Sequence, residues 1–149
     1  MRRTKLLVGL LILSIFIGLA GASCAGAKGQ TESHDLNMAP MADMPADVQA
    51  APVNVQEAYR FAAANPEVLT QIPCYCGCGA IGHNSNYACY VSGKNEDGGL
   101  AFDAHALGCS ICVDISQDTM RLLNNGKSVA EIRSYVDQTY SQYGPSNMQ

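Results

Sequence analysis

Residues 73–79, PCYCGCG, place three thiols within five residues and surround them with one proline and two glycines. Alternate residues of an extended chain share one face, so the side chains of Cys74, Cys76 and Cys78 can point the same way. Neighbouring Cα atoms of this triplet would lie about 7 Å apart, at the edge of what a disulfide bond accepts. A metal ion needs only sulfurs that converge on one point, and Gly77 allows the backbone to turn. The stretch therefore favours a shared ion, or bonds to distant cysteines, over disulfides inside the triplet.

Three further cysteines follow the triplet, at Cys89, Cys109 and Cys112, and His83 and His105 lie between these groups. Thiolates combined with imidazole suit Cu(I) or Zn(II) and not Mg²⁺ or Ca²⁺. We therefore expect a soft-metal site in a loop, with Cu(I) favoured and Zn(II) as the other candidate. The candidate metal ligands are Cys74, Cys76, Cys78, Cys89, Cys109, Cys112, His83 and His105.

The same six cysteines allow two other interpretations. An even number of cysteines in an exported protein permits three structural disulfides with their pairing left open, which would make the chain a disulfide-stapled binding module. Cys109 and Cys112 also have the CxxC spacing of a redox dithiol, at the start of a predicted helix whose N-terminus stabilises a thiolate. A thiol–disulfide redox protein that uses this pair is thus the second alternative. We expect Asp103 to orient His105 or to cap a helix.

The N-terminal residues have the pattern of an export signal. Residues 1–23 begin with basic side chains, continue as an apolar run and end in small residues, as a bacterial signal peptide does. The small residues directly before Cys24 resemble a lipobox, so we expect Cys24 to be lipidated. The protein would then be exported and anchored to the outer face of the bacterial cell membrane or to the periplasmic membrane surface. An ordinary cleaved signal and an uncleaved anchor are the alternatives, although the run is short for a spanning helix of about 20 residues.

The charge of the chain excludes some classes of partner and activity. Residues 1–23 hold three of the nine basic residues and none of the 13 acidic ones, so the remainder has six basic residues and a formal charge of −7. We do not expect an acidic exported protein to bind nucleic acid through a basic patch. The sequence has no Ser-His-Asp order, paired carboxylate motif or phosphate-binding loop, which favours a binding protein over an enzyme.

Residues 24–53 have the composition of a disordered tether, rich in Ala, Gly, Pro, Ser and acidic residues. Three methionines recur in it at every third position, downstream of a histidine. Thioethers are soft ligands that favour Cu(I), although a compositionally biased linker also produces such patterns by chance. The accessory ligands expected here are His34, Met38, Met41 and Met44.

Residues 54–149 are predicted to form one small, mainly α-helical, Cys-rich domain with a short β-hairpin and the CxCxC motif in a loop. Asn54 with Glu57, and Ser128 with Glu131, have the spacing of helix capping boxes. Asn-Pro at residues 65–66 predicts another helix start. Residues 89–91 and 100–102 are the expected strands, with a Gly-containing turn between them. A helix beginning at the CxxC pair should end at the Asn-Gly of residues 125–126, and Gly-Pro at 144–145 should stop the last helix.

The segments IPCYCGCGAIGH, CYV, DAHALGCSIC and GKSVAEIRSYVDQTY, in this order, resemble the bacterial PCYCGC-motif lipoproteins over residues 55 to about 143. That family is exported and its function is undescribed, so the resemblance implies the compartment and the domain limits rather than the chemistry. The CxxC helix and the tail that follows it are similar to the cytochrome c maturation thiol reductases, which use a CxxC on a small helical bundle to reduce apocytochrome thiols. The additional CxCxC motif departs from the pattern of those reductases.

Together these features predict an extracytoplasmic, membrane-anchored lipoprotein that binds a soft metal ion for storage, delivery or sensing. Its expected partners are the membrane, through the lipid on Cys24, and a metal-exchange or redox partner protein. Nucleic acid is not among them.

Overall fold

The computed structural model describes residues 36–148. Its helices are α2 (Ala46–Gln49), α3 (Val53–Ala64), α4 (Pro66–Leu69), α5 (Ser110–Asn124) and α6 (Val129–Tyr140), and its strands are β1 (Val91–Lys94) and β2 (Leu100–Phe102). Short 3₁₀ turns occupy Met41–Asp43, Cys78–Ile81, Tyr87–Cys89, His105–Leu107 and Ser141–Tyr143. The predicted signal peptide, the lipidation site Cys24 and His34 lie outside the described residues. Within residues 36–148, no helix has the length and apolar character needed to cross a membrane.

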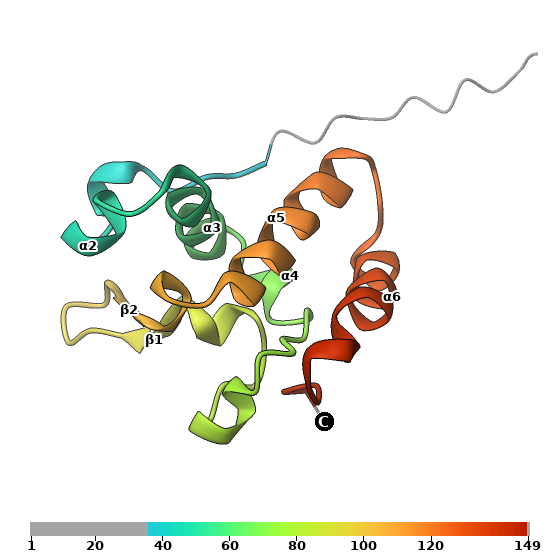
Figure 1. The fold of residues 1–149 in the computed structure, drawn as a ribbon. Coiled ribbons are helices and arrows are strands. Elements are labelled where there is room, and N and C mark those ends of the chain that lie inside the picture. The colour runs from blue at the N-terminus through green and yellow to red at the C-terminus, as the bar shows by residue number, and fades with distance from the viewer. Residues whose placement is uncertain (1–35, 149) are drawn as a thin grey trace, which may run out of the picture. The chain divides into compact units, whose positions relative to one another are not determined.

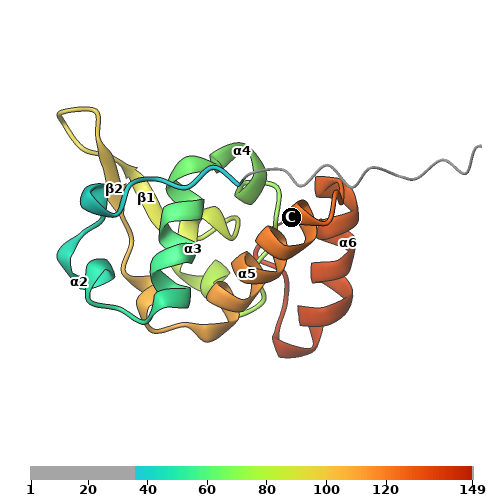
Figure 2. The same cartoon turned by 90° about the horizontal axis from the view of Figure 1, so that it is seen from above.

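Helix α5 lies between α3 and α6 and contacts both (Figures 1 and 2). The three helices bury large apolar side chains in the core, and the examples with an exposed fraction of 0% are Tyr59, Phe61, Ile115, Ile132 and Val136. Burial of apolar surface is the main favourable contribution to folding, so these side chains determine how the helices are placed. The prediction of a small, mainly helical domain is confirmed.

The predicted β-hairpin is also confirmed. Strands β1 and β2 pair antiparallel, with Val91 opposite Phe102 and an irregularity in register between Val91 and Gly93. An isolated two-stranded hairpin is marginally stable, so it needs a packing partner. The ring of Phe102 lies 6.3 Å from that of Tyr59 on α3, which provides such a contact. The first strand begins later than expected, because Cys89 lies in the preceding 3₁₀ turn.

Of the five local signals for helix ends, three are confirmed and one is wrong. The fifth placed the stop of the last helix at residues 144–145, whereas α6 ends at Tyr140 and a 3₁₀ turn, Ser141–Tyr143, leads to Gly144. Ser128 and Glu131 form the predicted capping box at the start of α6. Helix α5 ends as predicted, where the amide of Gly126 donates to the carbonyl of Leu123 and that of Lys127 to the carbonyl of Leu122, in a Schellman motif. Helix α4 begins at the predicted Asn-Pro, residues 65–66. The capping box expected at residue 54 is wrong, because α3 already begins at residue 53, after a proline.

Residues 36–53, which we expected to belong to a disordered tether, have defined structure, and this part of the expectation is corrected. Met44 and Val48 are 4% and 1% exposed and belong to the core, with α2 packed against α3. The carbonyl of Ala39 accepts a hydrogen bond from the side chain of Arg60 at 2.7 Å, and the amide of Ala39 donates to the carbonyl of Arg60 at 3.1 Å. The packed part of the chain thus extends upstream to about residue 36. Residues 24–35 lie outside the described part.

Candidate metal centre

All six cysteines of the described residues meet in one group, which we call the sulfur cluster: Cys74, Cys76, Cys78, Cys89, Cys109 and Cys112. Neighbouring Sγ atoms lie 3.3 to 3.6 Å apart. A disulfide bond requires about 2 Å, so none of these six cysteines is in a disulfide. Three elements contribute to the cluster: the loop that follows α4, the 3₁₀ turn at Tyr87–Cys89, and the first turn of α5.

The ligand atoms fall into four overlapping sets, in each of which all atoms lie within 4.8 Å of one another. One set combines three thiols and an imidazole, a second combines two thiols and two imidazoles, and two consist of three thiols. Both histidines of the sequence prediction are included, and His105 Nε2 lies 3.4 Å from Cys76 Sγ. The sets are Cys76–His105–Cys109–Cys112, Cys78–His83–Cys89–His105, Cys74–Cys76–Cys78 and Cys74–Cys89–Cys112.

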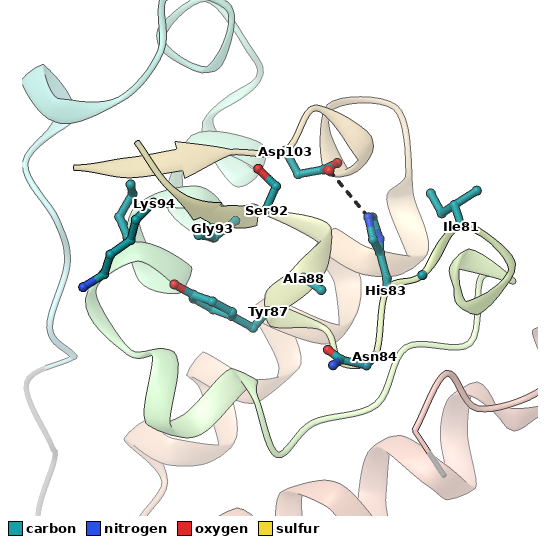
Figure 3. Close-up of a pocket in the computed structure, with 12 residues that line it drawn as sticks. Ile81, His83, Asn84, Tyr87, Ala88, Ser92, Gly93, Lys94 and Asp103 are labelled. Atoms are coloured by element: carbon teal, nitrogen blue, oxygen red, sulfur yellow. Dashed lines mark ion pairs between the residues drawn. The ribbon is translucent and has the colours of Figure 1, made fainter. Parts of the chain in front are cut away.

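One ring nitrogen of His83 faces a carboxylate, and the other is buried without a partner. Its Nε2 lies 3.5 Å from Asp103 Oδ2, while its Nδ1 is buried and has no hydrogen-bond partner. Figure 3 shows His83 and Asp103 facing one another beside a cavity of about 560 Å³. Metal-ligating histidines commonly donate their second ring nitrogen to a carboxylate, which fixes the ring and its tautomer. An unpaired buried nitrogen is costly, and a metal ion would satisfy it.

The same carboxylate also positions the other histidine. Asp103 Oδ1 accepts a hydrogen bond from the backbone amide of His105 at 2.7 Å. The backbone carbonyl of Asp103 accepts one from Tyr59 Oη on α3 at 2.6 Å. Asp103 therefore connects His83 and His105 to the helical core, which agrees with its expected role beside His105 and adds His83 to that role.

The loop that carries CxCxC is shaped by its glycine and held by α6. Gly77 has φ +85°, a left-handed conformation that glycine adopts without steric cost. It precedes the 3₁₀ turn that begins at Cys78. Tyr75, which lies between Cys74 and Cys76 in the sequence, donates a hydrogen bond to Asp137 on α6 at 2.6 Å. The turn and this anchor bring the sulfurs of the triplet together, as an extended strand would not.

The C-terminal residues close over this loop. Asn147 pairs with the backbone of Cys74 in both directions, since its Oδ1 accepts from the Cys74 amide at 2.7 Å and its own amide donates to the Cys74 carbonyl at 3.0 Å. Its Nδ2 donates to the carbonyl of Ser85 at 3.1 Å and lies 3.5 Å from Cys78 Sγ. The tail approaches so closely that a Cβ atom at Gly144 would lie 2.8 Å from the carbonyl oxygen of Tyr75. Asn147 is therefore a positioning residue for the sulfur cluster.

A buried polar network fixes the first turn of α5, which carries the CxxC motif. The carbonyl of Cys112 accepts hydrogen bonds from Asn86 Nδ2 at 3.2 Å and from Tyr90 Oη at 2.8 Å. Ser116 Oγ lies 2.7 Å from Asn86 Oδ1 and 2.8 Å from Tyr90 Oη. All three polar side chains are 0% exposed, and a satisfied buried network of this kind holds one arrangement of the core. These hydrogen bonds hold the residues before β1 against α5, the helix that carries Cys112.

The electrostatics of the cluster concentrate one negative charge on Cys74. Hydrogen bonds from the Cys112 and Cys89 thiols lower the pKa of Cys74 well below its usual range. The hydrogen bond to Cys74 raises the pKa of Cys112 in turn. Burial, reinforced by the charge on Cys74, raises the pKa of Cys76 and that of Cys78. Without metal, the surroundings thus favour a thiolate at Cys74 and neutral thiols at Cys76, Cys78 and Cys112.

We predict that Asn147→Ala lowers the free energy of unfolding by about 1–3 kcal/mol, because the buried amide of Cys74 loses its acceptor. Urea denaturation of the full chain, followed by circular dichroism, measures this. Gln142→Ala is the matched control in the same C-terminal segment, since Gln142 is exposed, and a change within about 0.5 kcal/mol is expected. Equal unfolding free energies for Asn147→Ala and the unchanged chain would contradict the role of Asn147.

The structure brings together all eight side chains that the sequence marked as candidate ligands, and their ligation of a metal stays a prediction. The methionines lie in a different environment: Met44 is buried in the core, and Met38 and Met41 pack against it. Packing in and against the core explains why these three positions carry apolar side chains. Their role as accessory metal ligands also stays a prediction. Sequence reasoning missed Asn147 and Asn86, which have no motif and act through contacts with distant segments.

A family model described as "Protein of unknown function with PCYCGC motif" matches residues 13–147. Neither a curated protein nor a solved structure matches the chain.

Proposed function

The chain belongs to this PCYCGC-motif family, and we propose that it is an extracytoplasmic, membrane-anchored protein that binds soft metal ions, with Cu(I) favoured, through the sulfur cluster. The observation that carries the proposal is the convergence of six thiols and two imidazoles, with Sγ–Sγ spacings of 3.3 to 3.6 Å. Thiolates about 2.3 Å from a tetrahedral ion lie about 3.8 Å from each other, close to these spacings. The unpaired buried nitrogen of His83 supports the same conclusion.

The chemistry of the donor atoms favours Cu(I) over Zn(II). Thiolate-rich surroundings with few harder donors favour the softer ion, and the donor atoms of the four sets are sulfur and imidazole nitrogen only. Zn(II) is the second candidate.

The membrane anchor is proposed from the sequence before residue 36. Small residues precede Cys24 as in a lipobox, and the lipid would hold the domain at the outer membrane surface, where it would store, deliver or sense the metal. Cys24→Ser should release the protein from the membrane fraction of the producing bacterium. Retention of this variant in that fraction would contradict the anchor.

Metal uptake by the full chain, kept reduced and anaerobic from the cell onward, tests the binding function. We expect stoichiometric Cu(I) in elemental analysis and retention of Cu(I) against a competing chelator. Cys76→Ala should weaken uptake strongly, because Cys76 Sγ lies 3.5 Å from Cys112 Sγ and 3.4 Å from His105 Nε2. Met41→Ala, which changes one of the three methionines expected to be accessory ligands, should reduce metal uptake much less. Absence of Cu(I) and Zn(II) uptake by the fully reduced chain would refute the proposal.

A further inference from the structure

The overlapping ligand sets cannot all be filled at once, because the two sets of four share the imidazole of His105. If His105 joins the first set, four candidate ligands are left over, and they are again three thiols and one imidazole. We propose, building on the proposed function, that the centre holds two soft metal ions in two such half-sites. The outer half-site is one of the four sets, Cys76, His105, Cys109 and Cys112, and the inner half-site is made of the four ligands that remain, Cys74, Cys78, Cys89 and His83.

The inner half-site is assembled by contacts among its own members. Cys78 Sγ and Cys89 Sγ lie 3.6 Å apart, and both lie within 4.8 Å of the ligand nitrogen of His83. Cys74 Sγ lies within 4.8 Å of the sulfurs of Cys78 and Cys89. The buried Nδ1 of His83 has no other partner. Three thiols and one imidazole are a complete tetrahedral ligand set for a soft ion.

Cys74 also connects the two half-sites. Its Sγ lies 3.3 Å from Cys112 Sγ and 3.5 Å from Cys76 Sγ, and both of these belong to the outer half-site. A thiolate in this position is suited to bridge two ions, and its negative charge offsets the repulsion between them.

The half-sites differ in their access to solvent. The three inner thiols are at most 3% exposed, and His83 is 11% exposed. In the outer half-site, Cys76, His105 and Cys109 are partly exposed, and only Cys112 is fully buried. A chelator or an acceptor protein can therefore reach the outer ion first. The outer ion is the exchangeable one, and the inner ion is retained.

The full chain, reduced and kept anaerobic, should bind two Cu(I) ions per chain at saturation, as counted by native mass spectrometry. A soluble Cu(I) chelator should then remove them in two phases of equal amplitude, one at least about tenfold faster, as the difference in exposure implies. Cys109→Ser should bind one ion and lose only the fast phase. Ser110→Ala, a change at the neighbouring exposed position, should keep two ions and both phases.

The outcomes separate this inference from the function on which it rests. If the chain takes up neither Cu(I) nor Zn(II), the proposed function fails. If the chain saturates at one ion, loses two ions in a single phase, or loses both through Cys109→Ser, only the two-ion inference fails. His105→Gln provides a second outer variant in case Cys109→Ser does not fold, as judged by circular dichroism, and it should also leave the slow phase. His83→Gln should remove the slow phase and leave the fast one.

Discussion

Replacement of Cys74 by serine is expected to abolish retention of the inner ion. It should also lower the affinity of the full chain for Cu(I) by at least about 100-fold. Residues that only orient the ligands of a metal usually change its affinity by about 10–100-fold, so a larger loss marks a ligand. Cys74 Sγ lies within 4.8 Å of four other sulfurs, those of Cys76, Cys78, Cys89 and Cys112. A hydroxyl has nearly the same shape as a thiol but is a hard and weakly binding donor toward Cu(I). The change therefore removes a ligand without leaving a large void.

Competition with a chelator of known Cu(I) affinity measures this effect. Cys24→Ser is the matched control, because it makes the same chemical change at the cysteine that precedes the described residues, and it should keep both ions. Thermal unfolding of the metal-free variants tests whether Cys74→Ser still folds. We expect that it does, because the hydrogen bonds between the Cys74 backbone and Asn147 do not involve the replaced side chain. A folded Cys74→Ser chain with full affinity would show that Cys74 is not a ligand.

Local chemistry made much of the fold predictable. The capping box at Ser128 and Glu131 and the helix end at Gly126 depend on hydrogen bonds within a few residues, so the residue types alone indicate them. Residues 36–53 were wrongly predicted as disordered because their structure depends on tertiary packing and has no local signal. Helix α2 has only four residues, too few for a periodic pattern, and it is stabilised by the burial of Met44 and Val48 in the core.

The candidate site likewise has one part that the sequence predicts and another that it does not. Cysteine and histidine reveal their chemistry by residue type, so the eight candidate ligands could be chosen from the sequence. Their grouping into half-sites could not, because it depends on how the loop after α4 meets the first turn of α5. Asn147 contacts Cys74 across 73 residues of sequence, and an asparagine near a chain end carries no local signal of such a role. Likewise, Asn86 is identified only by its burial and by its hydrogen bond to the Cys112 carbonyl.

The affinity for Cu(I) should rise steeply with pH. Metal ions bind thiolates, and the raised pKa values of Cys76, Cys78 and Cys112 keep these thiols protonated near neutral pH in the metal-free chain. Each of them must lose a proton when the metal binds, whereas Cys74, whose pKa is lowered, is already a thiolate. Mass action then makes the logarithm of the overall binding constant increase with pH, with a slope equal to the number of protons released, at least about three for a two-ion centre that uses all three thiols.

Calorimetric titration in two buffers with different ionisation enthalpies counts these protons directly, and competition titrations between about pH 6 and pH 8 give the slope, in the range where the thiols are still protonated. Cys78→Ser should release fewer protons than the unchanged chain, because it removes one thiol whose proton the metal displaces. Met41→Ala should release the same number. Proton release near zero, with an affinity independent of pH, would mean that the thiols do not exchange their protons for metal. The uptake would then have to involve other donors, and the sulfur cluster would not be the binding site.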